Sequence, residues 1–236
     1  MTQENLKDRL EGIYRRYHSP VFLRWDPLWS VRRLADPRER EIGGLIASCL
    51  SYGRVERIIK SCERIFTISD SGLYNFVFYR TLAEKERALR GFKHRFNDGT
   101  DIALLCESVR RVHETYGSLG ALFSEGFQKK GTVRGGLEHF CDCLHRTAGS
   151  ITRRKHRSFD YLLPRPQRGG SCKRLCMCCR WMVREDDGID LGVWPDVSRA
   201  ALVYPLDTHI ASIARRMGAL RRKTVDWKSA EEVTHF

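Results

Sequence analysis

The sequence predicts an all-α protein. Apolar residues recur at three- and four-residue spacing along most of the chain, and no alternating strand pattern of useful length is present. The chain has 236 residues, of which 42% are hydrophobic, so it can bury a full core as one domain or as two small lobes. A parallel α/β fold would need strands between the helices, and the sequence offers none that is convincing.

The first two helices have clear boundaries. The apolar spacing predicts an amphipathic helix over residues 6–17, which ends near Pro20. The next helix begins at a strong start signal, because Asp36 can cap it, Pro37 suits its first turn and Glu39 occupies the capping-box position.

The middle of the chain continues the helical pattern. Residues 42–66 predict two helices joined at Tyr52 and Gly53, with one long kinked helix as the alternative. The segment NDGT, residues 97–100, predicts a turn that opens another helix. Shorter helices are expected over 119–127 and 132–146.

The chain changes character after residue 150. The segment LLPRPQRGGS, residues 162–171, has two prolines and two glycines and predicts a loop or hairpin, after which a compact helix begins at Ser171. The same region is basic. The residues that carry this charge include Arg153, Arg154, Lys155, Arg165, Arg168, Lys173, Arg174, Arg180 and Arg184.

The charge balance favours a polyanionic partner. The formal net charge is +13, from 42 Lys and Arg against 29 Asp and Glu, which is large for this length. We expect a DNA phosphate backbone to be drawn to the basic stretch, with Arg153, Arg154 and Lys155 among its contacts. A soluble protein that is merely basic is the alternative.

The sequence shows no membrane or export signal. No apolar run approaches the roughly 18 residues that span a bilayer, and the start, MTQENLKDRLEG, lacks a charged segment followed by an apolar one. We expect a cytoplasmic monomer without a cofactor or a bound metal.

Nine cysteines in such a chain indicate reduced thiols rather than a disulfide framework. Four of them crowd together at positions 172, 176, 178 and 179, which raises the alternative of a metal or redox centre. Their C-x3-C-x-C-C spacing is not a common metal spacing, so we expect Cys172, Cys176, Cys178 and Cys179 to act as small apolar core residues.

The segment RGGSCK, residues 168–173, has the chemistry of a ligand site. Gly169 and Gly170 allow a tight turn and close approach of a ligand, and Ser171 is a good helix cap. Lys173 then occupies the first helical turn, where the helix dipole favours the neutral amine that a nucleophile needs. A solvated surface lysine or a simple phosphate contact is the alternative for Lys173.

A second element lies 34 positions downstream. In YPLDTHIASIARR, residues 204–216, Asp207 precedes a helical pattern, so it can cap that helix or serve as a catalytic carboxylate mounted on it. The stretch alone supports both interpretations.

These elements together resemble the helix-hairpin-helix DNA glycosylases and AP lyases. LDTHIASIARRMG is similar to the D-T-H element of that superfamily, the hairpin lysine precedes it in the correct order, and LIASCLSYGRVERIIKSCERIF resembles the N-terminal element of the endonuclease III class. SYGR, CKRLCMCCRWMVR, DGIDLGVW and PLDTH together look like a bacterial family of unknown function within it. The interval between Lys173 and Asp207 is similar to that of archaeal-type 8-oxoguanine glycosylases.

The resemblance implies two helical lobes, a helix-hairpin-helix element and a DNA-binding cleft between the lobes. Residues 34–200 would form one lobe, and residues 1–33 with 201–236 the other. Because bacterial members continue beyond an equivalent of SAEEVTHF, this lobe is expected to lack its C-terminal part. Lys173 would attack C1′ of a flipped damaged nucleotide and form a Schiff base, with Asp207 assisting. An oxidised purine is one candidate for the damaged base.

Further site residues follow from the same resemblance. Backbone N–H groups over Gly169, Gly170, Ser171 and Cys172 would hold a phosphate, with Arg174 beside them. Tyr52 would fill the gap left by the flipped base, or would be a core tyrosine. Trp181 and Trp194 would line a base pocket, with core packing as the alternative.

Two departures from the superfamily pattern limit this hypothesis. The hairpin PRPQRGGSCK departs from the usual L-P-G-V-G-x-K, and the C-terminal cysteines that hold an iron–sulfur cluster in endonuclease III are missing from the sequence.

The sequence predicts a solvated acidic turn at Asp186, Asp187 and Asp190, with a cation site as the alternative. The rival functions are a catalytically inactive DNA-binding protein on the same scaffold and a metal or redox protein built on the cysteine cluster.

Overall fold

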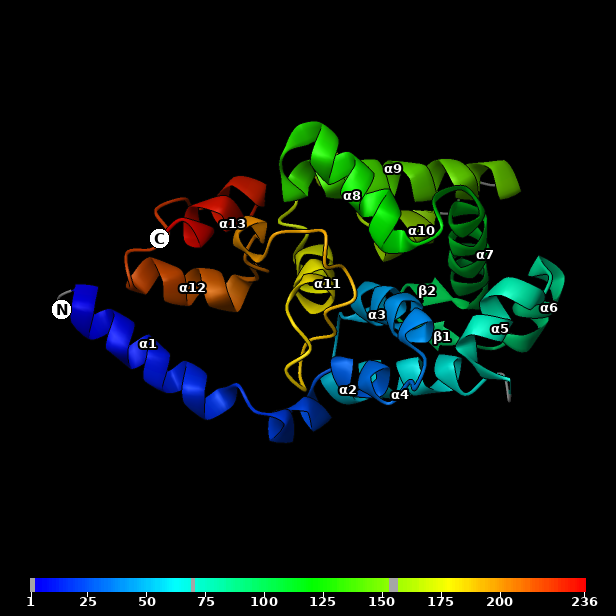
Figure 1. The fold of residues 1–236 in the computed structure, drawn as a ribbon, viewed down its shortest axis with the longest axis horizontal. Helices are drawn as coiled ribbons and strands as arrows, with labels where there is room; N and C mark the ends of the chain where they lie inside the picture. The colour runs from blue at the N-terminus through cyan, green and yellow to red at the C-terminus, as the bar shows by residue number, and fades with distance from the viewer. Residues whose placement is uncertain (1–2, 69–70, 153–156) are drawn as a thin grey trace.

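The computed structural model describes residues 3–68, 71–152 and 157–236. It is an elongated arrangement of helices in which both chain ends lie at the same end of the molecule (Figure 1). The predicted all-α class is confirmed, because strands are confined to one short hairpin in the described residues.

The elements follow one another with short connections. In the first half these are α1 (Gln3–Tyr17), η1 (Pro20–Trp25), α2 (Leu28–Arg32), α3 (Pro37–Leu50), α4 (Val55–Phe66), α5 (Gly72–Tyr79), α6 (Leu82–Ala88), β1 (Lys93–His94) and β2 (Asn97–Asp98). In the second half they are α7 (Gly99–Tyr116), α8 (Leu119–Lys130), α9 (Val133–Ile151), α10 (Arg157–Leu162), η2 (Pro166–Arg168), α11 (Lys173–Val183), η3 (Arg199–Ala201), α12 (Thr208–Arg216) and α13 (Trp227–Thr234).

Helix α3 is the centre of the larger core. Every residue from Ile42 to Leu50 is buried, so the helix is enclosed on all sides rather than amphipathic. A Cβ atom built on Gly44 would lie 2.3 Å from the terminal methyl group of Met182, so the glycine lets α11 pack closely against α3. This contact fixes the helix whose first residue is Lys173.

The predicted pair of helices over residues 42–66 is confirmed. α3 ends at Leu50 and α4 begins at Val55, and between them Gly53 has φ +102°, a conformation that favours glycine. The hydroxyl of Ser51 donates to the carbonyl of Ala47, so it closes the last turn of α3.

Two start signals differ in detail from the prediction. Asp36 caps α3 as expected, but Glu39 does not complete a capping box, because it accepts a hydrogen bond from the backbone of Tyr74 on α5. The turn expected at residues 97–100 lies earlier, since Asn97 and Asp98 form β2. Asp98 then caps α7 in a reciprocal box with Asp101.

The segment between α10 and α11, where a loop or hairpin was predicted, is a glycine-containing loop with the short helix η2 (the hairpin segment below), and Ser171 is not the helix cap. Cys172 occupies the cap position with φ 50°, a left-handed conformation unusual for a residue with a side chain. The hydroxyl of Ser171 donates instead to the carbonyl of Leu206, 2.9 Å away. The hairpin is therefore tied to the segment that precedes α12.

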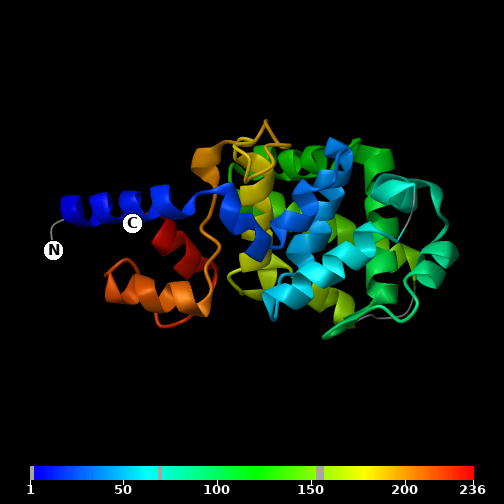
Figure 2. The same ribbon diagram turned by 90° about the horizontal axis from the view of Figure 1, so that it is seen from below.

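Buried side chains form two clusters. The larger extends from η1 to Val197 and includes Trp227 of α13. The smaller consists of Leu206, Ala211, Ala214, Ala219, Leu220 and Ala230 from α12, α13 and their connections. Figure 2 shows these C-terminal helices set apart from the main body. Leu23, Leu28 and Val31 belong to the larger cluster, and the lobe boundary expected at residue 34 stays a prediction.

Helix α1 confirms the predicted N-terminal helix but not the burial of its apolar face. Ile13 and Tyr17 are each more than half exposed, and Figure 1 shows the helix extending along one end of the molecule. None of the helices in the described ranges combines the length and apolar character that a bilayer-spanning segment needs.

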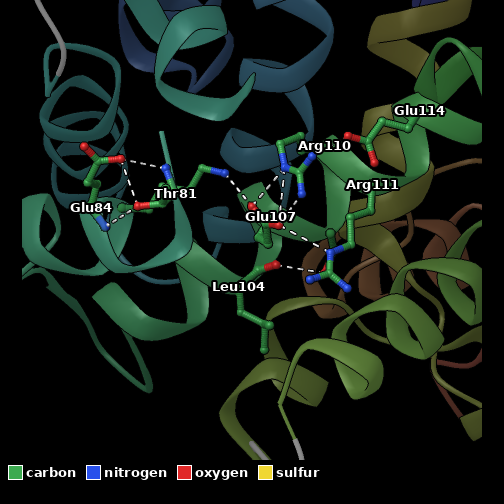
Figure 3. Close-up of polar contacts among 9 residues, drawn as sticks. Thr81, Glu84, Leu104, Glu107, Arg110, Arg111 and Glu114 are labelled. Atoms are coloured by element: carbon green, nitrogen blue, oxygen red, sulfur yellow. Dashed lines mark hydrogen bonds and ion pairs between the residues drawn. The ribbon is translucent and has the colours of Figure 1, made fainter. Parts of the chain in front are cut away.

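A buried ion pair joins α6 and α7. Nζ of Lys85 lies 2.7 Å from Oε2 of Glu107, and both side chains are almost completely buried. Arg110 and Arg111 approach the same carboxylate from the adjoining turn (Figure 3). Burial alone would raise the pKa of Glu107, but the hydrogen bonds from Arg110 and Lys85 lower it to about 2.

Candidate functional site

The structure brings Lys173 and Asp207 into direct contact. Nζ of Lys173 donates to Oδ2 of Asp207 over 2.8 Å, and the two side chains are 40% and 28% exposed. The amine is therefore reachable by a ligand while its partner carboxylate is more enclosed.

Two further contacts hold the hairpin against the C-terminal helices. Ser171 Oγ bonds the carbonyl of Leu206, the residue just before Asp207, and Gly170 forms an antiparallel bridge with Asp226 at the start of α13. These contacts set the register between the start of α11 and the start of α12. The distance between the amine and the carboxylate follows from that register.

Asp207 is both a helix cap and the partner of the lysine. Its Oδ1 accepts the backbone N–H of Ile210 at 2.9 Å, and its Oδ2 accepts the ammonium of Lys173. Burial would raise the pKa of Asp207, but these two hydrogen bonds outweigh it and lower the pKa. The side chain is consequently a carboxylate at neutral pH.

Lys173 lines a cleft of about 680 Å³. The cleft is bounded by Asp26 and Pro27, by residues 51–53 of the junction between α3 and α4, and by the hairpin residues 170–174. Val55, Ile58, Pro164, Met177 and Val225 supply its apolar surface. Val225 packs on the smaller cluster and Ile58 belongs to the larger one, so the cleft lies between the two.

Asp26 is a carboxyl group that lines this cleft, which the sequence did not indicate. Its Oδ1 accepts the backbone N–H of Leu28 at 2.8 Å. Burial raises the pKa of Asp26, and the Leu28 N–H together with the positive charges of Arg180 and Lys173 offsets only part of this effect. The pKa of Asp26 is thus raised, whereas that of Asp207, the other carboxyl group near Lys173, is lowered.

Tyr52 lies at the cleft with a fixed orientation. Its hydroxyl is 2.6 Å from Oδ1 of Asn97 and 2.9 Å from the carbonyl of His94. Its ring meets Tyr161 edge to face, with ring centres 4.9 Å apart, and the guanidinium of Arg174 lies over it. Burial raises the pKa of Tyr52 to about 12, so the phenol remains protonated.

A basic pocket of about 480 Å³ adjoins the cleft, and Tyr52 lines both. Five exposed cationic side chains surround this basic pocket: Arg54, Arg57, Lys60, Lys93 and Arg95. None of the five forms an ion pair within the described ranges. This pocket was not predicted from the sequence, although Arg54, Arg57 and Lys60 recur every three residues, a spacing that places them on one face of a helix.

The predicted basic stretch is largely neutralised within the protein. Arg165 and Arg168 approach Asp142 and Asp160, at 3.7 Å and 3.1 Å. Arg180 and Arg184 both approach the buried Asp190. These four arginines therefore have carboxylate partners within the protein. Arg153, Arg154 and Lys155 lie outside the described residues.

Arg174 and Gly169 have intramolecular partners. The guanidinium of Arg174 donates to the carbonyl groups of Cys49, Tyr161 and Leu162. The backbone N–H of Gly169 donates to the carbonyl of Pro166 at 3.1 Å. Contacts of these groups with DNA, which the sequence predicted, would have to compete with these bonds.

The two tryptophans expected at a base pocket are core residues. Trp181 is 2% exposed and Trp194 is 4% exposed, and neither lines the cleft of Lys173. The indole N–H of Trp194 donates to Glu41 over 2.7 Å, and its ring stacks on Phe123. Both side chains therefore have the core-packing role that was the alternative to a base pocket.

The cysteine cluster is part of the larger core, as the preferred interpretation predicted. Cys172, Cys176, Cys178 and Cys179 are all buried with apolar neighbours. In the part of the chain that the structure describes, no group of three or more His, Cys, Asp or Glu side chains has a metal-binding arrangement. Burial raises the pKa of the Cys172 thiol to about 11.

The acidic turn is exposed at Asp186 and Asp187, as predicted, but both carboxylates are ion-paired and Asp190 is buried. Asp186 pairs with Arg32 at 2.6 Å, and Asp187 pairs with His18 at 2.6 Å. Asp190 is completely buried beside two arginines of α11. The carboxylates therefore hold the turn against the N-terminal segment and against α11. His18 and Arg32 lie more than 150 positions before the turn, so the sequence did not reveal them as partners.

Comparison with known proteins assigns a family without assigning an activity. Residues 26–236 match the family described as "Protein of unknown function (DUF2400)". The chain belongs to this family. The predicted membership of a family of unknown function is thereby confirmed, and the matched region contains the Lys173–Asp207 pair and the cleft.

No curated protein and no solved structure matches this DUF2400 chain. The resemblance to DNA glycosylases stays a prediction from the ordered sequence motifs.

Proposed function

We propose that the protein is a DNA base-excision glycosylase with AP lyase activity, in which Lys173 is the nucleophile. The observation that carries the proposal is the 2.8 Å contact between Lys173 Nζ and Asp207 Oδ2 at the edge of a cleft. An amine nucleophile needs a neighbouring group that can take its proton. The reaction also needs a group that stabilises the positive charge that develops on the sugar. Asp207 meets both needs because it is ionised and in contact with the amine.

The chemistry follows from these two side chains. Lys173 gives up its proton through Asp207 to solvent, and its nitrogen attacks C1′ of a nucleotide that has been flipped out of the duplex. The bond between C1′ and the base breaks, and its electron pair leaves with the base. Opening of the sugar ring then yields a Schiff base with Lys173. The carboxylate of Asp207 stabilises the positive charge that develops on the sugar.

Two features support DNA as the partner. The net charge is +13, and the five unpaired cations of the basic pocket stand next to the cleft through Tyr52. A phosphate backbone that passes the basic pocket would carry a flipped nucleotide to the cleft. The hairpin between α10 and α11 would be the helix-hairpin-helix element, with Gly169 at φ +85° making its turn.

The proposal is tested by borohydride trapping on duplexes that carry 8-oxoguanine, uracil, an oxidised pyrimidine or an abasic site. An adduct is expected with the wild-type protein on the abasic duplex and on at least one damaged base. It should vanish in Lys173→Gln, weaken at least 10²-fold in Asp207→Asn, and persist in Lys129→Gln, a surface lysine on α8. A folded protein that binds every duplex and traps none would instead indicate an inactive DNA-binding protein.

A further inference from the structure

Asp26 is a carboxyl group that the proposed chemistry leaves without a role. With Pro27 it forms one side of the cleft that Lys173 lines. Its Oδ1 is occupied by the backbone N–H of Leu28, and no described residue forms a hydrogen bond with its Oδ2. The second oxygen is therefore available to a ligand in the cleft.

The surroundings of Asp26 favour the neutral acid. The neighbouring cleft surface includes the apolar side chains of Ile58 and Met177, and burial raises the pKa of Asp26. The other titratable or charged groups at the cleft are Tyr52, Cys172, Lys173 and Arg174, and Arg180 acts on Asp26 from two turns further along α11. Two carboxyl groups whose environments push their pKa values apart are typical of an acid and a base that share one reaction.

On the basis of the proposed function, we propose that Asp26 is the general acid that protonates the departing base. Lys173, in its neutral form, contributes the electron pair of its nitrogen to a new bond with C1′. The bond from C1′ to the base breaks, and the base takes that electron pair together with the proton of Asp26. The base leaves neutral, Asp26 becomes a carboxylate, and the lysine nitrogen carries the positive charge.

This assignment defines the substrate class that needs Asp26. A damaged base must present a nitrogen or oxygen acceptor to Oδ2 of Asp26, and its release depends on the acid. An abasic sugar has no base to release, so its reaction with Lys173 is independent of Asp26. The two substrates therefore separate the role of Asp26 from the role of Lys173.

The test compares Asp26→Asn with wild type in two single-turnover assays, one of base release from the damaged duplex and one of borohydride trapping on the abasic duplex. Base release is expected to fall about 10²–10³-fold, and abasic trapping to stay within about twofold. Asp26→Glu, which retains an acid, should recover part of the base release. Asp196→Asn, an exposed aspartate outside the cleft, is the matched control. Thermal melting establishes that each variant is folded.

The pH profile gives a second readout. Wild-type base release should fall as pH rises through the pKa of Asp26, and this limb should be missing in Asp26→Asn. Unchanged base release in Asp26→Asn would overturn the inference, as would equal losses of base release and abasic trapping in a folded variant. A wild-type protein that traps the abasic site but releases no base would overturn the role of Asp26 alone. Absence of both reactions would overturn the proposed function.

Discussion

Nζ of Lys173 lies 2.8 Å from Oδ2 of Asp207, although the two residues are 34 positions apart in the chain. Each begins a helix: Lys173 is the first residue of α11, and Asp207 caps α12. The bond from Ser171 to Leu206 holds these two helix starts together. The backbone positions of the two helix starts therefore place Lys173 and Asp207 next to each other.

The basic pocket is expected to bind DNA phosphates. Replacement of Arg57 and Lys60 by glutamine should weaken duplex binding, because two phosphate contacts are lost. Each lost contact should also make the plot of log affinity against log salt concentration less steep by about 1. Fluorescence anisotropy over a range of salt concentrations measures this slope. The matched control removes two charges by changing Lys129 and Lys130 to glutamine on α8, which lies across the molecule from α4 (Figure 1). Equal slopes in both double variants would exclude the basic pocket from DNA binding.

Arg174 is expected to stabilise the fold in the absence of DNA. Its guanidinium serves three carbonyl groups from α3 and α10 and lies over the rings of Tyr52 and Tyr161. Arg174→Ala should lower the free energy of unfolding by about 1–2 kcal/mol, because three carbonyl groups, two of them in partly buried contacts, lose a charged donor. Arg174→Lys should recover only part of this, since an ammonium cannot reproduce the planar fork.

Urea unfolding of the DNA-free protein measures these effects. A variant with wild-type stability and weakened DNA binding would show that Arg174 acts as a phosphate contact, as the sequence predicted.

The buried pair of Lys85 and Glu107 is expected to contribute strongly to stability. Lys85→Met removes the buried ammonium and leaves the Glu107 carboxylate with Arg110 and Arg111 alone, so it should cost about 1–3 kcal/mol. Lys129→Met removes the exposed partner of Glu125 and should cost at most about 1 kcal/mol. The comparison of the two variants in urea separates a buried pair from a surface pair.

The same pair predicts an acid-dependent loss of stability. The pKa of Glu107 is lowered to about 2 in the folded protein, so its contribution is fully present above the unfolded value of roughly 4.3 and is lost as pH falls towards 2. The free energy of unfolding of wild type should therefore decrease more steeply over this range than that of Glu107→Gln. Parallel pH curves for the two proteins would contradict the assignment.

The nine cysteines are expected to be slow to react in the native protein. All of them are buried, and burial raises the pKa of Cys49 to about 11 and that of Cys178 to about 12, so the reactive thiolate is scarce at neutral pH. An aromatic disulfide reagent should label fewer than one thiol per chain within minutes and all nine after denaturation. Rapid native labelling of several thiols would revive the redox alternative.

The sequence anticipated the local elements of the site better than their surroundings. The glycine-containing hairpin, the lysine after it and the aspartate before the next helix are features of short segments, so their order could be recognised. Asp26 has no such local signature, because it joins the cleft only through the packing of η1 and α2 on the larger core. The helices were predictable from their apolar spacing, and the exposure of α1 was not, since it depends on what lies beside that helix.

Charge was the other feature that sequence position alone misplaced. Arg180 and Arg184 add to a basic stretch along the chain, yet both surround the buried Asp190. Lys93 and Arg95 come from the β-hairpin and join residues of α4 some 35 positions earlier only in the folded protein. Net charge thus predicts a class of partner, and among the described residues the fold determines which cations lack a carboxylate partner.

The central claim is that Lys173 is the amine that attacks C1′. Its most direct test is mass spectrometry of the peptide that remains attached to an abasic duplex after borohydride reduction. The account predicts that the modification lies on Nζ of Lys173 and that Asp207→Asn reduces its yield without moving it. Attachment through another lysine or through the N-terminal amine, or a fully folded protein that forms no adduct, would contradict it.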